Sequence, residues 1–143
     1  MRIEEILARK ARPEVVTIDR GASVRTLLGV LAEHGIGACV VSTDGQRVDG
    51  IVSERDVVRR LYDDEGLLEA DVGSIMTPAV ETCSPDATAE EIMTVMTRRR
   101  IRHVPVVSDG RLTGIVSIGD LVKHRIEELA FERDQLEHYV HQV

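Results

Sequence analysis

The chain has 143 residues, of which 43% are hydrophobic and only 2% are aromatic. This length suits one compact domain, or two small units that share a core built from Val, Ile, Leu, Met and Ala. The formal net charge of −7 argues against a nonspecific nucleic-acid binder, because such proteins normally show a strongly basic face.

The chain begins with Met1-Arg2-Ile3-Glu4-Glu5, which leads directly into an amphipathic segment and predicts a short N-terminal helix. We expect no secretory signal peptide at this end, and no apolar run approaches the length of a membrane span. Cys39 and Cys83 lie in apolar, strand-like segments outside any C-x-x-C motif. Because this pattern predicts neither a disulfide framework nor a zinc site, we expect a reduced, cytoplasmic setting.

The first half of the chain alternates strand-like and helix-like segments. β-Branched runs, turn dipeptides, and Ser or Thr at helix starts mark the boundaries. The expected elements are a strand at 15–17, a helix capped by Ser23, a strand at 38–41, a turn at Asp44-Gly45, a strand at 51–52 and a helix starting near Ser53. Residues 62–71 are acidic and contain Gly66, so they are predicted to form a linker.

The second half repeats this order. The expected elements are a strand at 80–82, a helix with Thr88 and Glu91 as a capping box, a strand at 104–107, a turn at Asp109-Gly110, a strand at 115–116 and a helix starting near Ser117. A shift of 65 residues aligns 15–45 with 80–110, and a shift of 64 aligns 50–60 with 114–124. The identities, among them Gly-Ile-Val-Ser at 50–53 and 114–117, indicate an internal duplication.

The tail from Leu121 onward lacks Gly and Pro, and its apolar residues follow a seven-residue spacing. The two seam positions hold Val122, Leu129, Leu136 and Val143, and Ile126, Arg133 and Val140. This spacing is typical of a short coiled coil, which would form a dimer contact. The alternative is an amphipathic helix that packs on its own domain.

The segments Gly50–Asp56 and Gly114–Asp120 share the pattern Gly-apolar-apolar-Ser-x-x-Asp. They resemble the signature of cystathionine-β-synthase (CBS) domains, and Ile101–Val107 resembles the apolar-x-x-apolar-Pro-Val strand of that family. The resemblance covers roughly residues 1–125. It is specific because two matched copies occur, each after a strand in a repeated unit.

The resemblance implies an α+β fold of two tandem CBS repeats. Each repeat is β-α-β-β-α, and the two pack about a pseudo-two-fold axis, followed by a C-terminal amphipathic helix. The chain then divides into repeat 1 with the N-terminal helix (1–61), a linker (62–71), repeat 2 (72–125) and the C-terminal helix (126–143). Such pairs commonly form disk-shaped homodimers, and their usual ligands are AMP, ADP or ATP, less often NADH or S-adenosylmethionine.

The resemblance also implies two nucleotide-binding clefts, here named after their aspartates. The Asp120 cleft would comprise Val16, Thr17, Ile36, Gly37, Arg55, Arg102, His103, Ser117 and Asp120. The Asp56 cleft would comprise Ser53, Asp56, Glu81, Thr82, Ile101 and Arg102. An aspartate in a first helical turn can accept hydrogen bonds from both ribose hydroxyls, and the free N–H groups there favour anions.

The two repeats differ in charge, which ranks the clefts. If Arg55, Arg102 and His103 gather at Asp120, and Glu81 stands in the other cleft, we expect tighter nucleotide binding beside Asp120. The same cations would disfavour S-adenosylmethionine.

Each of these residues also has a structural interpretation. The Ser and Asp residues of the motifs could only cap helices, Arg102 could lie on the surface, and His103 could be a satisfied polar group under a loop. No nucleophile–base pair, metal-ligand cluster or Walker-type loop is visible in the sequence. We therefore expect a regulatory adenine-nucleotide-binding module and not an enzyme, with no metal, nucleic acid or membrane as partner. The alternative function is a structural interaction protein with degenerate clefts.

Overall fold

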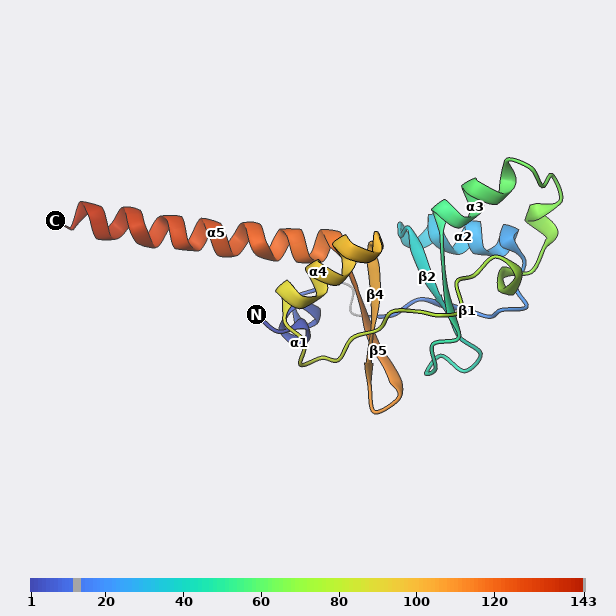
Figure 1. Ribbon diagram of the computed structural model, residues 1–143, viewed down its shortest axis with the longest axis horizontal. Coiled ribbons are helices and arrows are strands. Elements are labelled where there is room, and N and C mark those ends of the chain that lie inside the picture. The colour runs from blue at the N-terminus through green and yellow to red at the C-terminus, as the bar shows by residue number, and fades with distance from the viewer. Residues whose placement is uncertain (12–13, 143) are drawn as a thin grey trace.

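The computed structural model describes residues 1–11 and 14–142. Its elements in chain order are α1 (Ile3–Ala8), β1 (Thr17–Ile18), α2 (Val24–His34), β2 (Ala38–Val41), β3 (Gly50–Ser53), α3 (Glu54–Leu61), the 3₁₀ turns η1 (Leu67–Glu69) and η2 (Val72–Ser74), α4 (Ala89–Arg99), β4 (His103–Ser108), β5 (Arg111–Ser117) and α5 (Ile118–His141). Two small sheets lie near each other, with α2 and α3 beside one and α1, α4 and the start of α5 beside the other (Figure 1). This arrangement confirms the predicted α+β fold of two tandem units.

The two sheets differ in their first strand. In the first sheet β1 pairs in parallel with β2, and β2 pairs antiparallel with β3. In the second sheet β4 and β5 pair antiparallel, and the expected strand at 80–82 is reduced to one parallel bridge between Cys83 and Val106. That prediction was wrong in extent. The preceding bond of this parallel ladder would run from the N–H of residue 105 to the carbonyl oxygen of Glu81, and Pro105 has no N–H to donate.

The N-terminal helix packs on the second repeat and not on the first, with which the sequence groups it. Ile3 and Ile6 of α1 lie in the hydrophobic core formed around α4, β4 and β5. In return, Val72 and Ile75, which lead into the second repeat, lie in the core formed around α2, β2 and β3. Each repeat therefore contributes apolar side chains to the hydrophobic core of the other, and these contacts hold the two repeats together.

The segment at 62–71 is also more ordered than an acidic linker. Leu67 of η1 is 1% exposed and belongs to the first core. Ala70 accepts a hydrogen bond from the N–H of Val24, and Val72 donates one to Ala22. The linker therefore packs along the first repeat because Leu67 and Leu68 provide large apolar side chains among its charges.

The helix starts follow the predicted caps. Ser23 and Thr88 cap α2 and α4, and Ser53 and Ser117 cap α3 and α5. The ends of α2 and α4 both turn through the left-handed region, at Gly35 (φ 62°) in the first repeat and at Arg100 (φ 55°) in the second. A residue with a Cβ adopts this conformation at some cost, so the turn that leads from α4 into β4 is held by its surroundings.

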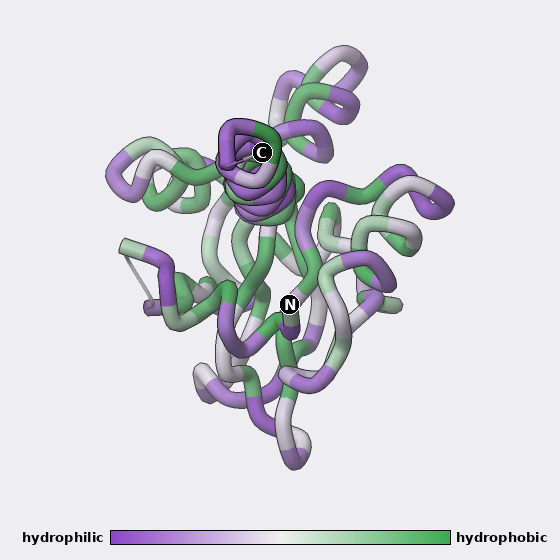
Figure 2. Tube along the Cα trace, turned by 90° about the vertical axis from the view of Figure 1, so that its left-hand side faces the viewer, coloured by the Kyte–Doolittle hydropathy of each residue, from purple (hydrophilic) through white to green (hydrophobic). Residues whose placement is uncertain are grey.

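Helix α5 is much longer than the body that holds it. Leu121 and His124 are buried against the second repeat, whereas every described residue after Ala130 is exposed. Figure 1 shows the helix standing clear of the body, with the C-terminus at its far end, and Figure 2 views the same helix end-on from its C-terminus. The tail is thus a continuous helix to His141, and its described part after Ala130 does not pack on its own domain. The seam residue Val143 lies outside the described residues. No described helix has the length and apolar character needed to cross a membrane.

Candidate functional site

The two Ser-x-x-Asp motifs form matching capping boxes at the N-termini of α3 and α5. The backbone N–H of Ser53 donates to Oδ2 of Asp56 at 2.8 Å, and that of Ser117 donates to Oδ2 of Asp120 at 2.9 Å. In return each serine hydroxyl accepts the N–H of its aspartate. Within the described chain, Oδ1 of either aspartate makes no hydrogen bond, so each carboxylate keeps an oxygen for a ligand.

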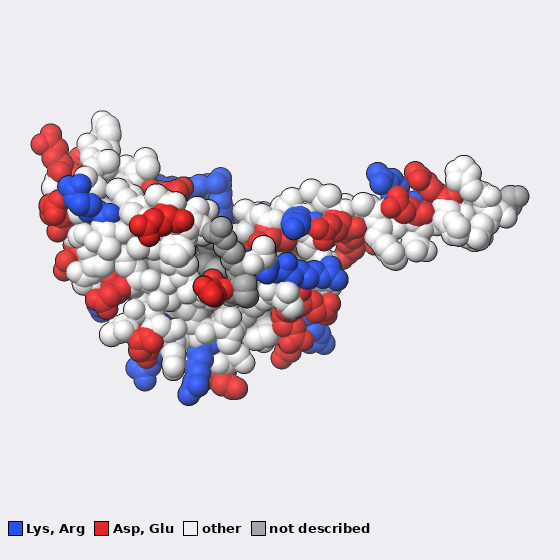
Figure 3. Space-filling model, turned by 180° about the vertical axis from the view of Figure 1, so that it is seen from behind, with Lys and Arg blue, Asp and Glu red and all other residues white. Residues whose placement is uncertain are grey.

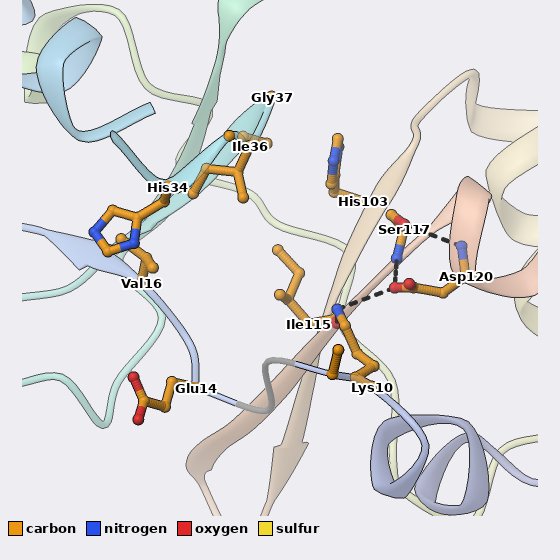
Figure 4. Close-up of a pocket in the computed structure, with 13 residues that line it drawn as sticks. Lys10, Glu14, Val16, His34, Ile36, Gly37, His103, Ile115, Ser117 and Asp120 are labelled. Carbon is orange, nitrogen blue, oxygen red and sulfur yellow. Dashed lines mark hydrogen bonds and ion pairs between the residues drawn. The ribbon is translucent and has the colours of Figure 1, made fainter. Parts of the chain in front are cut away.

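The Asp120 cleft is a cavity of about 680 Å³ between the two repeats. Figure 4 shows Val16, His34 and Ile36 on one side and His103, Ser117 and Asp120 on the other. Its wall also includes Lys10, Ala11, Glu14, Gly35, Gly37, Ala38 and Ile115. Apolar side chains from the first repeat therefore face a helix N-terminus of the second.

Lys10 occupies the polar end of this cleft. Its ammonium Nζ lies 3.0 Å from Oδ2 of Asp120 and donates to the carbonyl oxygen of Ile115 at 2.9 Å. Burial alone would raise the pKa of the Asp120 carboxyl, but the hydrogen bonds from Ser117 and Lys10 and the charge of Lys10 outweigh it, so the pKa is lowered. Asp120 is therefore ionised, and its Oδ2 already forms an ion pair with Lys10.

His103 lies on the boundary between the clefts. It borders both cavities, as does Gly37. Burial lowers the pKa of His103, and the nearby charges of Lys10 and Arg102 add to that effect against the opposing charge of Asp120. His103 is thus neutral at pH 7 and can donate or accept a hydrogen bond there.

The Asp56 cleft is a cavity of about 530 Å³ with a strongly basic wall. Five arginines border it, together with three carboxylates: Arg55, Arg59, Arg99, Arg100 and Arg102, and Glu54, Asp56 and Glu81. Among the described residues only Arg99 of these five forms an ion pair, with Glu81 at 3.7 Å across an exposed surface. The other four arginines border the cavity and form no ion pair with any described residue.

The structure distributes the predicted residues differently from the sequence-based ranking. Arg55 and Arg102 border the Asp56 cleft and not the Asp120 cleft, so of the three expected cationic residues only His103 lies beside Asp120. Arg55 directly precedes Asp56 in the first turn of α3 and stays with it. The arginines on which the ranking depended therefore border the other cleft.

The other predicted residues divide as expected, with two exceptions. Val16, Ile36, Gly37, Ser117 and Asp120 border one cavity, and Ser53, Asp56, Glu81, Ile101 and Arg102 border the other. Thr17 and Thr82 border neither.

Sequence reasoning missed Lys10, Arg59, Arg99 and Arg100 as cleft residues. Lys10 follows α1, which packs on the second repeat, and this exchange carries its side chain to Asp120. Two signals were present. The first is the similarity of residues 3–7 to residues 72–76 in the sequence. Leu7 lies over Gly114 as Met76 lies over Gly50, so this similarity could have placed Lys10 beside the second motif. The run Arg98-Arg99-Arg100 directly precedes the strand that was assigned to the clefts.

Fold and site together define a class of protein: a pair of tandem α+β repeats with two related clefts. The wall of each cleft contains a Ser-x-x-Asp motif at the N-terminus of a helix. The family model for the CBS domain matches residues 3–63 and 72–127. The chain belongs to the CBS domain family.

Relatives share this architecture. The crystal structure of the CBS-domain containing protein ATU1752 from Agrobacterium tumefaciens is 42% identical and has a TM-score of 0.82, covering 87% of this chain and 99% of that one. The structure of CBS domain protein PAE2072 from Pyrobaculum aerophilum, complexed with AMP, is 30% identical with a TM-score of 0.74, covering 84% and 89%. The mitochondrial CBS domain-containing protein CBSX3 of Arabidopsis thaliana is 36% identical over 115 residues, which make up 77% of this chain and 56% of that protein. The chain thus spans just over half the length of this curated relative.

Proposed function

We propose that the chain is a regulatory module that binds an adenine nucleotide, AMP, ADP or ATP, in one or both clefts. One observation carries this proposal: each Ser-x-x-Asp motif closes a capping box on the wall of a cavity and leaves one carboxylate oxygen without a partner among the described residues. Vicinal ribose hydroxyls are donors that suit such an oxygen. AMP is bound by the Pyrobaculum relative, which supports the same class of ligand here.

The Asp56 cleft is the better candidate for a ligand with several phosphates. Arg55, Arg59, Arg100 and Arg102 lie along its wall, and guanidinium groups bind phosphate oxygens through charge-assisted, often bidentate hydrogen bonds. An anion in this cavity would also relieve the repulsion between these groups. In the Asp120 cleft, the only described Lys or Arg is Lys10, which is already paired.

Regulation, in this proposal, needs no catalysis. A nucleotide that binds across the repeats shifts the chain toward the arrangement that it binds more tightly. Among the described residues no three His, Cys, Asp or Glu side chains gather to hold a metal. A homodimer and a regulated partner protein, as expected from the family, form part of the proposal. NADH and S-adenosylmethionine are the alternative ligands, and a purely structural role is the alternative function.

The test is a thermal-unfolding panel with AMP, ADP, ATP, NADH, S-adenosylmethionine and GTP. A ligand at 100 times its Kd adds about 2.7 kcal/mol to the free energy of unfolding, which is a rise of several degrees in Tm. Asp56→Asn and Asp120→Asn each remove one carboxylate charge and keep an oxygen that can cap the helix.

Glu91→Gln is the matched control, because it alters the third capping box, with Thr88, away from both cavities. We expect an adenine nucleotide to raise Tm in the wild-type protein and in Glu91→Gln, and one or both aspartate variants to lose that rise. If no compound in the panel shifts Tm in nucleotide-free protein, the module does not bind adenosyl ligands and the structural role is favoured.

A further inference from the structure

Helix α5 presents a long apolar stripe that its own chain does not cover. The stripe comprises Val122, Ile126, Leu129, Leu136 and Val140, which are between 41% and 66% exposed. It starts at Val122, next to the buried Leu121, and continues along the part of the helix that projects into solvent (Figure 1). The CBS domain match ends at residue 127, so most of the stripe is an addition to the family's domain.

The spacing of the stripe is that of a two-stranded coiled coil. Successive members are separated by four or three residues, with Arg133 filling the one charged position. In heptad notation Val122, Leu129 and Leu136 occupy d, and Ile126, Arg133 and Val140 occupy a. Solvent-exposed helices in a monomer have no reason to keep such a register, whereas a second helix would bury it.

The charges that flank the stripe disfavour a parallel pair of identical helices. In a parallel pair each a residue meets itself, so Arg133 would face the partner's Arg133 inside the seam. Glu132, at g, would lie beside the partner's Glu137, at e. Both contacts bring like charges together, which opposes association.

An antiparallel pair removes the contact between the two Arg133 side chains and separates Glu132 from the partner's Glu137. Glu132 then lies beside the partner's Glu132 at the two-fold axis, where the two Arg133 side chains flank this pair of carboxylates. When two copies of the helix cross at the level of residue 131, Arg133 packs against the partner's Leu129 and lies next to the partner's Glu132. At the ends, Lys123 lies beside the partner's Glu137, and the two-fold symmetry repeats each contact. Figure 3 shows acidic and basic side chains interspersed along this helix. Charge complementarity therefore selects a second copy in one orientation.

We propose that α5 is the interface between two copies of this chain, whose stripes pair antiparallel. Ile126 then packs against the partner's Leu136, and Val122 against the partner's Val140. Arg133 is tolerated in the seam because the partner's Glu132 compensates its charge. The interface does not depend on nucleotide binding.

The interface is tested first by mass in solution, using light scattering over a concentration series. The wild-type chain is expected to be a dimer, and Leu136→Glu, which places a charge against the partner's Ile126, a folded monomer. Phe131→Glu is the matched control, because Phe131 is 65% exposed on the opposite side of the same helix and is expected to leave the dimer intact. A wild-type monomer, or a dimer that Leu136→Glu leaves unchanged, would overturn the proposal.

The orientation is tested by oxidative cross-linking of introduced cysteines. Ile126→Cys mixed with a larger, tagged Leu136→Cys chain is expected to give a disulfide-linked heterodimer, and Leu136→Cys alone is expected to give none. Cross-linking of Leu136→Cys to itself would show a parallel pair and refute the antiparallel one. The wild-type protein controls for Cys39, which is buried, and Cys83, which is partly buried.

Discussion

Lys10 and Asp120, 110 residues apart in the sequence, form an ion pair with Nζ 3.0 Å from Oδ2. The pair joins the end of α1 to the start of α5, and both side chains are 23% exposed. Asp56, the matched aspartate of the first repeat, has no ion pair in the described parts of the chain. In the Asp120 cleft, ribose hydroxyls would therefore share the aspartate carboxylate with a lysine. In the Asp56 cleft, the aspartate carboxylate pairs with no cation among the described residues.

Lys10→Met is expected to strengthen the binding of adenosine, which has no phosphate, in the Asp120 cleft. Removing the competing ammonium is worth about 1 kcal/mol, or about a fivefold lower Kd. The measurement is calorimetric titration in an Asp56→Asn background, so that only the Asp120 cleft reports. Arg9→Met, which removes the neighbouring cation, is expected to leave the Kd unchanged. Weaker binding by Lys10→Met would show instead that Lys10 contacts the ligand.

Arg102→Gln is expected to weaken ATP binding in the Asp56 cleft and leave adenosine binding unchanged. A hydrogen bond to a charged phosphate contributes about 1.5 to 3 kcal/mol, so the Kd for ATP should rise at least about tenfold. The titration uses an Asp120→Asn background. Arg98→Gln is the control, since Arg98 lies on α4 in the same basic run but does not border the cavity. Equal losses for ATP and adenosine would indicate that Arg102 supports the fold of the cleft and not the phosphates.

The free energy of unfolding is expected to depend on pH through Asp120. Although burial opposes ionisation, the hydrogen bonds from Ser117 and Lys10 and the charge of Lys10 lower its pKa in the folded state. A carboxyl whose pKa is lower in the folded state stabilises that state fully at pH values above its pKa in the unfolded state, which is about 3.9. This stabilisation is lost as the pH falls through the lower pKa of the folded state. Urea unfolding at a series of acidic pH values should show this loss in the wild-type protein and a smaller one in Asp120→Asn. The same slope in both proteins would contradict the assignment, because Asp44 and Glu128, whose pKa values are also lowered, are present in both.

The duplication explains why so much of the fold could be predicted from the sequence. Ser23, Ser53, Thr88 and Ser117 each begin a helix because a hydroxyl beside free N–H groups is a local signal that tertiary packing did not override. The exchange of α1 between the repeats is not local, and so the position of Lys10 could not be read from helix and strand signals. The placement of the charges could not be predicted for the same reason: it required the direction in which Arg55 and Arg102 extend, and sequence spacing does not give this.

The pseudo-two-fold packing itself can be tested at Gly50, where the first repeat meets the segment that crosses from the second. A Cβ at Gly50 would lie 2.6 Å from Sδ of Met76 and 3.0 Å from the backbone oxygen of Thr77, which pairs with Ile51. Gly50→Ala should therefore lower the free energy of unfolding by about 1 to 3 kcal/mol, as overpacking typically does.

The matched position, Gly114, should be less sensitive. A Cβ there would meet only the terminal carbons of Leu7, at 2.7 and 2.9 Å, and this side chain can rotate away. Gly29→Ala is the control: it lies inside α2 with nothing within 4 Å of the new Cβ, so it should stabilise the protein by up to about 1 kcal/mol. Chemical denaturation of the three variants should rank them Gly29→Ala, Gly114→Ala, Gly50→Ala in decreasing stability. If Gly50→Ala is as stable as the wild-type protein, Met76 and Thr77 of the crossing segment lie farther from Gly50 than these contacts indicate.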